Sequence, residues 1–243
     1  MAEISAFLRN GPGVYGGNES KIRLLAEAVL WIMRSGAQRG PLPAEHGLWN
    51  SVCRPFSRRS GKGVRERLFS FCSGDPDMEF LRPDSTAVRA HPCAAGAVKK
   101  HGGQEKQALG RSRGGFSTKV HTSPDGLGNP LRFILTPGQS RDIAQPEALT
   151  SGFQPGAVGA DKGYDSDSYR QWLQDLGTAE VIPSRSCRNN PQDYDRHLYK
   201  ERHLVECFIN KIKHFRRIFS RFDKLAGRYL PFLRFAGALI WLR

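Results

Sequence analysis

The hydrophobic pattern of this chain changes its period near residues 74–77, and the change divides the sequence into two parts. Before this turn, apolar residues recur every three or four positions, which is typical of helices buried on one face. After it, short apolar runs alternate with turns rich in Gly, Pro, Asp and Asn, which is typical of strands. We therefore expect a small all-helical part followed by a part that contains a sheet.

The second part alternates predicted strands and helices. They are a strand at 78–86, a β-hairpin of 116–123 and 130–137, a helix at 142–150, a strand ending at Asp161, a helix ending at Gly177, a strand at 179–184 and a basic helix at 198–222. This order predicts an α/β domain with a mixed sheet. The expected division is a loose Gly-rich leader at 1–20, a small helical domain at 21–76 and an α/β domain at 77–243.

The charge of the chain points to a polyanionic partner. There are 37 Lys and Arg against 23 Asp and Glu, for a net charge of +14, and nucleic acid is the partner that such an excess favours. The longest apolar run, Leu24 to Met33, is interrupted by Glu27 and is shorter than the roughly 20 residues that a bilayer requires. We expect no membrane contact, no secretion signal, five reduced cysteines and a cytoplasmic location.

The basic helix at 198–222 keeps a glutamate, Glu206, among its cations. On a helical wheel the apolar side chains fall on one side, and Glu206 points the other way. The predicted apolar stripe contains Leu204, Val205, Phe208, Ile212, Phe215 and Phe219, and the row around the glutamate contains Tyr199, Arg202, Asn210 and Lys213. This row is either a functional site or a solvated face on which Arg202 and Glu206 pair.

Two aspartates follow predicted strands, where α/β sheets place their chemistry. Asp84 lies at the end of the first strand and Asp161 at the end of a later one, and Glu206 comes from the helix after the last strand. If the three carboxylates converge, they form an all-oxygen site suited to Mg²⁺ or Mn²⁺. Two such ions can catalyse phosphodiester displacement.

The chain resembles the DDE transposases of bacterial insertion sequences. Tyr199, Arg202, Glu206 and Lys213 match the Y-x2-R-x3-E-x6-K signature of one large group, and the stretches DSTAVRAH, SRGGFSTKVH and ADKGYDS are similar to its blocks around the two aspartates. The resemblance implies an RNase H-like DDE catalytic domain at 77–243, a mixed sheet flanked by helices. It also implies that the small helical N-terminal domain at 21–76 is a helix-turn-helix-like DNA-binding domain. It implies that Asp84, Asp161 and Glu206 hold two Mg²⁺ (or Mn²⁺) ions.

The same resemblance implies an activity and partners. It implies an enzyme that cleaves the inverted-repeat ends of its own element and joins the 3′-OH to target DNA. The implied partner is double-stranded DNA, bound by a homodimer. The implied location is the bacterial cytoplasm, in association with the nucleoid. Tyr199, Arg202 and Lys213 are expected to hold DNA phosphates because they share the face of Glu206. Weaker expectations of phosphate contact fall on Arg111, Arg113, Lys119 and His121. Asp125, Asp165 and Asp167 are expected to cap helices or fill turns.

Pro83 departs from the pattern of an active enzyme. It precedes Asp84 in a strand that an RNase H-like sheet pairs on both sides, and proline removes a ladder donor there. We therefore expect a weak or inactive enzyme, which Pro83→Ile, with Arg82→Val, would stabilise and activate. Two alternatives stay open: a decayed copy that binds DNA without cutting it, and a structural basic protein that coats nucleic acid.

Overall fold

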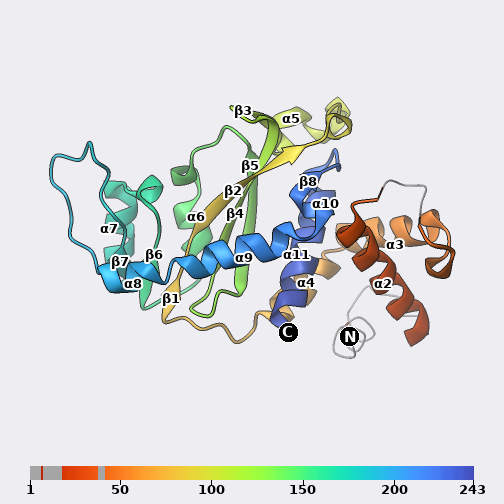
Figure 1. Ribbon diagram of the computed structural model, residues 1–243, viewed down its shortest axis with the longest axis horizontal. Coiled ribbons are helices and arrows are strands. Elements are labelled where there is room, and N and C mark those ends of the chain that lie inside the picture. The colour runs from red at the N-terminus through yellow and green to blue at the C-terminus, as the bar shows by residue number, and fades with distance from the viewer. Residues whose placement is uncertain (1–6, 8–17, 38–41) are drawn as a thin grey trace. The chain divides into compact units, whose positions relative to one another are not determined.

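The computed structural model describes Phe7, residues 18–37 and residues 42–243 (Figure 1). Its contacts divide the chain into two compact units. The helical unit comprises Met1–Gly74, Arg89–Gln107 and Ile212–Arg243, and the sheet unit comprises Asp75–Val88 and Ala108–Lys211. The sheet unit does not include all of residues 77–243, since residues 89–107 and the last 32 residues group with the N-terminal helices. Most of the expected leader, residues 1–6 and 8–17, lies outside the described residues.

The helical unit is built on five helices: α2 (Glu19–Ser35), α3 (Trp49–Gly61), α4 (Val64–Cys72), α10 (Arg216–Phe219) and α11 (Ala226–Trp241). Three of them were expected between residues 21 and 76, with a break at Ser60–Gly61. The break occurs because Gly63 adopts a left-handed conformation, with φ of 69°, before α4 begins. Helix α11 was not expected. It packs on α3 and α4, and the ring of Phe232 stacks on Phe56 at 4.5 Å.

The helical unit also contains short elements. They are η1 (Ala44–His46), η2 (Pro92–Ala94), η3 (Lys99–His101), α5 (Gly103–Lys106) and β8 (Ser220–Arg221). Strand β8 pairs in parallel with Arg89 and Ala90 at the end of β2. None of the described helices combines the length and the apolar character that a bilayer span requires.

The sheet unit holds seven strands and six helical segments. The strands are β1 (Phe80–Leu81), β2 (Asp84–Ala90), β3 (Gly110–Ser112), β4 (Gly115–Pro124), β5 (Pro130–Pro137), β6 (Ala157–Gly159) and β7 (Ala179–Val181). The helical segments are η4 (Asp142–Ala144), α6 (Pro146–Thr150), η5 (Lys162–Tyr164), α7 (Asp167–Asp175), α8 (Arg196–Lys200) and α9 (His203–Lys213). The last residues of strand β2 and the last residues of helix α9 group with the helical unit.

The strands are mixed in direction, as expected. Strands β4 and β5 form an antiparallel hairpin, and β4 neighbours β2. Strands β1, β6 and β7 run parallel to one another. The strands thus form two sheets, one with the order β1, β6, β7 and one in which β4 lies between β3 and β2 and also pairs with β5, and the chain passes from one to the other through the short connection between β1 and β2. Together with the helical N-terminal region, this confirms the expected mixed α/β fold class.

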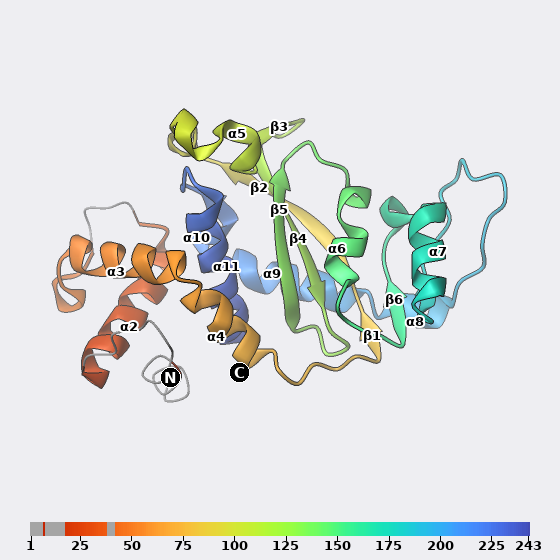
Figure 2. The same ribbon diagram turned by 180° about the vertical axis from the view of Figure 1, so that it is seen from behind.

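Helices cover both faces of the strands. Figures 1 and 2 show α9 across one face of β2, β4 and β5, and α6 on the opposite face. The α9 side is apolar because Val205 and Phe208 are fully buried, with the ring of Phe208 6.1 Å from that of Phe133 on β5. Burial of a side chain of this size contributes roughly 1.5–3 kcal/mol, so the helix is held firmly against the sheet.

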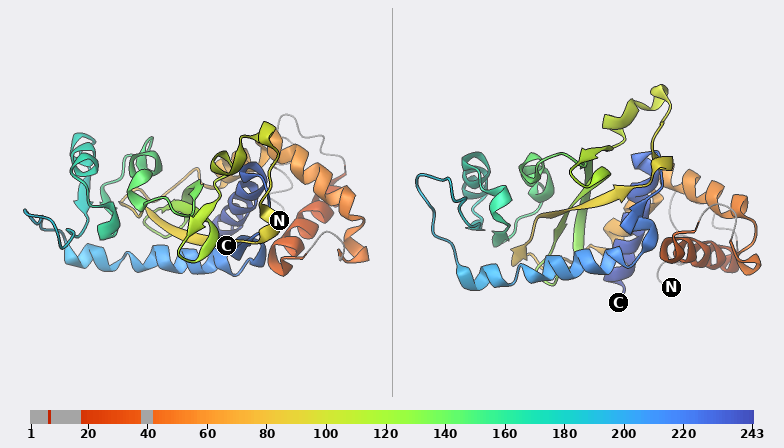
Figure 3. Two further views of the ribbon diagram at one scale, coloured as in Figure 1. Left: turned by 90° about the horizontal axis from the view of Figure 1, so that it is seen from above. Right: turned by 45° about the horizontal axis from the view of Figure 1, so that its top comes forward.

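The predicted helix at 198–222 is wrong in its continuity. The chain forms α8, α9 and α10 and then β8, although α8 and α9 follow each other nearly in line (Figure 3). One consequence is that Phe219, expected in the apolar stripe, is 59% exposed. Neither break contains Gly or Pro, so the sequence carries no local signal for them.

The first predicted strand is also interrupted. Strand β1 stops at Leu81 and β2 starts at Asp84, with Arg82 and Pro83 between them. The backbone N–H of Arg82 still donates to Pro124 O on β4 at 3.0 Å, whereas Pro83 has no N–H to donate. Asp84 therefore begins a strand, and the expectation that it ends one is wrong.

Candidate active site

Asp84 stands at the start of β2 with its carboxylate largely enclosed. Its Oδ1 accepts a hydrogen bond from the backbone N–H of Ser85 at 2.7 Å, and its Oδ2 accepts one from Arg202 Nη2 at 3.2 Å. Burial raises the pKa of Asp84 above its ordinary value, while Ser85 and Arg202 act in the opposite direction. The charges of Asp161 and Asp142 raise it further. Several negative charges therefore share this part of the sheet unit.

Asp161 is held by the tight turn that follows β6. It is the N-cap of η5, and its Oδ1 accepts the backbone N–H of Gly163 at 2.7 Å. A Cβ atom at position 163 would lie 2.7 Å from Asp161 Oδ1 and 3.4 Å from Asp142 Oδ2. The turn therefore requires glycine there, because only a residue without a side chain lets both carboxylates approach.

Arg202 links Asp84 to Glu206. The arginine lies in the turn between α8 and α9, and its Nη1 donates to Glu206 Oε1 at 3.0 Å. Burial alone would lower the pKa of Arg202, but the charges of Asp84, Asp161 and Glu206 raise it above its ordinary value. Two of the three predicted carboxylates, Asp84 and Glu206, thus contact one guanidinium, and the charge of Asp161 acts on it as well. Glu206 itself points away from the core, as expected, with 59% of its side chain exposed.

Apolar contacts hold α8 beside these carboxylates. Leu198 and Tyr199 pack against Phe80 of β1 and Val181 of β7, in a cluster that also includes Ala157 and Tyr194. The ring of Tyr194 meets that of Tyr199 edge to face at 5.3 Å. Burial raises the pKa of Tyr199, so its hydroxyl is protonated and can donate a hydrogen bond.

A fourth carboxylate, for which no sequence pattern provides a signal, and a lysine adjoin the site. Asp142 Oδ1 accepts from Lys119 Nζ at 2.9 Å and also from Ser85 Oγ. Burial opposes ionisation of Asp142, but the bonds from Ser85 and Lys119 lower its pKa below the ordinary value. Asp142 begins a one-turn helix after the hairpin, far in sequence from Asp84, so only the folded chain brings them together.

A basic groove borders this site within the sheet unit. It has a volume of about 630 Å³ and includes Gly163 and Asp142 in its lining. Its cationic lining residues are Lys119, Arg141, Lys162 and Arg185. The positive charge lies beside the carboxylates, where an anionic strand can be attracted without covering them.

The remaining predicted phosphate contacts lie in different environments. Arg111, on β3, and Arg113, just after it, are exposed, whereas Lys213 ends α9 among residues of the helical unit. His121 is fully buried, and its Nε2 lies 2.8 Å from Thr136 Oγ1. Burial lowers the pKa of His121 to about 4, so the ring is neutral at pH 7. The expectation that His121 meets phosphate is therefore wrong.

The three aspartates expected in caps and turns divide as well. Asp125 fills a turn as expected, accepting the backbone N–H groups of Leu127 and Asn129. Asp167 opens α7 directly after the capping residue, Ser166. Asp165 is the C-cap of η5, and its carboxylate is in addition buried in ion pairs with Arg170 and Arg188.

The chemistry of these carboxylates suits a hard metal ion, but their present spacing does not. All of the donors are carboxylate oxygens, the ligands that Mg²⁺ and Mn²⁺ prefer. Within the residues that the structure describes, however, no three carboxylates, imidazoles or thiols stand close enough together to ligate one ion. Closer approach of Glu206 to Asp84 requires Arg202 to give up one of its two carboxylate partners.

Comparison with known proteins gives consistent matches. The family model for the transposase DDE domain matches residues 76–240. A putative transposase for insertion sequence element IS6501 of Brucella ovis is 40% identical over 130 residues, which cover 53% of this chain and 100% of that protein. A putative transposase for element IS402 of Burkholderia cepacia is 32% identical over 135 residues, covering 51% of this chain and 62% of that protein.

Two further matches complete the comparison. The transposase for element IS1106 of Neisseria meningitidis serogroup B is 34% identical over 94 residues, covering 36% of this chain and 33% of that protein. Among solved structures, a chain of the Mos1 strand transfer complex is 15% identical, with a TM-score of 0.30, over 89% of this chain and 77% of that one.

Proposed function

Since the chain belongs to the transposase DDE domain family, we propose that it cleaves the ends of an insertion sequence and joins the released 3′-OH to target DNA. The observation that carries this proposal is the pairing of Arg202 with both Asp84 and Glu206, beside the charge of Asp161. The three carboxylates come from β2, the turn after β6 and α9, so their common electrostatic neighbourhood is a property of the fold rather than of one local motif.

Asp84, Asp161 and Glu206 are the residues that would hold two Mg²⁺ or Mn²⁺ ions. When bound, such ions activate the attacking oxygen and stabilise the leaving oxygen of a phosphodiester. The rise that Asp161 and Asp142 cause in the pKa of Asp84 supports this assignment, because closely spaced negative charges are stabilised by a cation.

Arg202 has two roles in this proposal. Without DNA it neutralises Asp84 and Glu206, and it becomes a phosphate ligand when a cation takes over that neutralising role. Tyr199 lies one turn before it on α8 and can donate its hydroxyl proton to a phosphate oxygen. Both residues would therefore position the strand that is cut.

The wider cationic surface is proposed to hold double-stranded DNA. Lys119 borders the groove, and Arg111 and Arg113 are exposed nearby in sequence. Lys213 is proposed as a phosphate contact of the helical unit, and the helices at 21–76 as a DNA-binding region. We propose that a homodimer binds the inverted-repeat ends and the target DNA.

A second candidate is a decayed copy that binds DNA without cutting it. The interruption of the strand at Arg82 and Pro83, directly before Asp84, favours this alternative. A misplacement of about 1 Å at a ligand lowers the rate by roughly a hundredfold. Both candidates share DNA binding and differ only in chemistry.

The test uses the purified chain and a DNA duplex that carries the inverted repeats flanking its gene. Mg²⁺ or Mn²⁺ is expected to give nicks at the repeat ends and strand-transfer products, and EDTA is expected to abolish both. A duplex with scrambled ends is the matched control. Binding of the specific duplex without cleavage in either metal would favour the decayed copy, and equal binding of both duplexes would favour a structural basic protein.

A further inference from the structure

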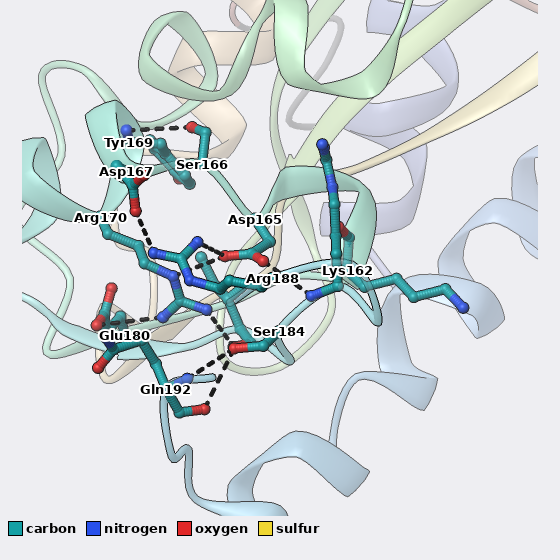
Figure 4. Close-up of polar contacts among 12 residues, drawn as sticks. Lys162, Asp165, Ser166, Asp167, Tyr169, Arg170, Glu180, Ser184, Arg188 and Gln192 are labelled. Atoms are coloured by element: carbon teal, nitrogen blue, oxygen red, sulfur yellow. Dashed lines mark hydrogen bonds and ion pairs between the residues drawn. The ribbon is translucent and has the colours of Figure 1, made fainter. Parts of the chain in front are cut away.

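A network of charged side chains lies beside the turn that carries Asp161 (Figure 4). Its centre is the Asp165 carboxylate, of which only 1% is exposed. Asp165 Oδ1 accepts from Arg170 Nε at 2.9 Å and from Arg188 Nη1 at 2.7 Å. Its Oδ2 accepts the backbone N–H of Arg185 at 2.8 Å. A buried carboxylate with three donors fixes the groups around it, because each would be costly to leave unpaired.

The electrostatics keep Asp165 ionised. Burial alone would raise the pKa of Asp165, but the N–H of Arg185 and the guanidinium groups of Arg170 and Arg188 lower it below the ordinary value. Arg170 is anchored in turn by Ile182 O at 2.7 Å and by an ion pair with Glu180 at 3.2 Å. The network is therefore charged at neutral pH and tied to both α7 and β7.

The network closes a loop, residues 184–192, which we name the clasp loop. Its two ends meet where the backbone N–H of Gln192 donates to Ser184 Oγ at 2.8 Å. Its middle is held by Arg188, which pairs with Asp165 and with Asp167 and donates to Asn190 O at 3.1 Å. The path of the loop is thus fixed by the ion pairs of Arg188, and its ends are fixed by the hydrogen bond between Gln192 and Ser184.

One side chain of the clasp loop reaches the turn after Asp161. Arg185 donates from Nε to Lys162 O at 3.0 Å and from Nη2 to Gly163 O at 2.8 Å. Gly163 in turn donates its own N–H to Asp161 Oδ1 at 2.7 Å. A continuous chain of hydrogen bonds therefore runs from buried Asp165, through Arg185 and the peptide groups of the turn, to the Asp161 carboxylate.

We propose that Arg185 is a positioning residue for Asp161, held in place by Asp165 and Arg188. Two donors of one planar guanidinium fix two successive carbonyl groups, and this sets the direction of the Gly163 N–H that orients the carboxylate. The consequence for metal affinity rests on the proposed function. Outer hydrogen-bond partners of metal ligands typically change metal affinity or activity by 10–100-fold, so this contact is expected to matter although it touches no substrate.

The experiment compares the full chain with Arg185→Ala, Arg185→Lys and Arg188→Ala. Arg185 is exposed, so its loss should leave the fold intact, and Arg196→Ala removes the same charge from an exposed position of α8 as a matched control. The first readout is NMR-detected hydrogen exchange of the Gly163 amide without metal or DNA. The second is calorimetric titration with Mn²⁺ in the absence of DNA.

Exchange at Gly163 is expected to accelerate about tenfold in Arg185→Ala and less in Arg188→Ala, with Mn²⁺ affinity falling about tenfold in Arg185→Ala. Arg185→Lys should share the defect because an ammonium group cannot reproduce the paired donors. Arg196→Ala should match the wild type in both readouts.

Unchanged exchange in Arg185→Ala, or wild-type behaviour of Arg185→Lys, would overturn the proposal. So would unchanged Mn²⁺ affinity of Arg185→Ala beside a wild type that binds Mn²⁺. If the wild type itself binds no Mn²⁺, the proposed two-metal function fails, and exchange alone then decides whether Arg185 orders the turn.

Discussion

Arg202 Nη2 lies 3.2 Å from Asp84 Oδ2, and this pair joins residues 118 positions apart in the sequence. The same guanidinium contacts Glu206 through Nη1 at 3.0 Å. The pairing of Arg202 with Glu206, four residues later, was expected from the helical pattern. The pairing of Arg202 with Asp84, at the start of β2, forms only when the chain folds. The pair places the signature helix directly at the first aspartate.

The three carboxylates are expected to be individually essential for cleavage. Asp84→Asn, Asp161→Asn and Glu206→Gln each remove a ligand charge, so each should lower metal-dependent cleavage below detection while DNA binding is retained. Cleavage is measured on end-labelled duplex and binding by gel shift. Asp175→Asn, an exposed carboxylate of α7, serves as the control and should cleave normally. A variant that cleaves near the wild-type rate would remove its residue from the site.

The close approach at Gly163 predicts a position-specific effect of a single methyl group. In Gly163→Ala the new Cβ would lie 2.7 Å from Asp161 Oδ1, so the carboxylate must move. Cleavage is expected to fall by roughly a hundredfold, the effect typical of a misplacement near 1 Å. Gly61→Ala is the matched control, because no atom lies within 4 Å of its new Cβ. Equal rates in the two variants would show that Asp161 tolerates displacement.

Arg82 and Pro83 are expected to respond to substitution in opposite directions. Arg82 is fully buried and donates to Asp125 O at 2.6 Å and Gly126 O at 2.8 Å. Asp125 O also accepts the Gly128 N–H at 3.1 Å, so Arg82→Val removes the donor mainly from Gly126 O, at about 1–3 kcal/mol. This reverses the expectation that Arg82→Val stabilises the strand. Pro83→Ile restores a ladder donor and should raise both the free energy of unfolding and the cleavage rate.

Urea unfolding of these two variants gives the free energies, with Arg89→Val, an exposed position of β2, as the control for β2. Melting temperature and cleavage rate that both stay constant in Pro83→Ile would mean that the interruption before Asp84 is harmless.

His121 is expected to make stability depend on pH. Its pKa is about 4 in the folded chain and about 6.5 when unfolded, so between these values the unfolded chain binds the extra proton. The contribution is fully present above about pH 6.5 and is lost as pH falls towards 4, by about 3 kcal/mol in all. Urea titrations from pH 4 to 7 give the free energy of unfolding at each pH, and its slope against pH should be shallower in His121→Gln than in the wild type. Identical slopes would indicate that the buried imidazole does not govern acid stability.

The phosphate contacts predict a change in salt dependence. Arg202→Ala and Lys213→Ala should each make the plot of log affinity against log salt concentration shallower by about 1, because one fewer counterion is released. Fluorescence anisotropy on duplex DNA between 50 and 200 mM salt, roughly the range over which such contacts are resolved, measures the slope. Gln174→Ala, an exposed neutral change, should leave it unaltered. If both cation variants keep the wild-type slope, the DNA lies elsewhere.

Local patterns in the sequence were sufficient for the mixed strand and helix order and for the row of Tyr199, Arg202 and Glu206. Both depend on which neighbours within a turn or a strand share a face, and periodicity reports that directly. Asp125 was likewise placed correctly in a turn, since its side chain bonds to backbone groups within four residues.

Only the tertiary structure decided the features that depend on distant segments. Asp142 meets Ser85 across 57 positions, and buried Asp165 binds Arg188 across 23, pairings that no local period encodes. The breaks around α9 contain neither Gly nor Pro, and helix α11 groups with the N-terminal helices rather than with the sheet. In each case the free energy comes from burying surfaces or pairing charges that meet only after the chain has folded, so the same residues read as ordinary turn or surface positions in the sequence.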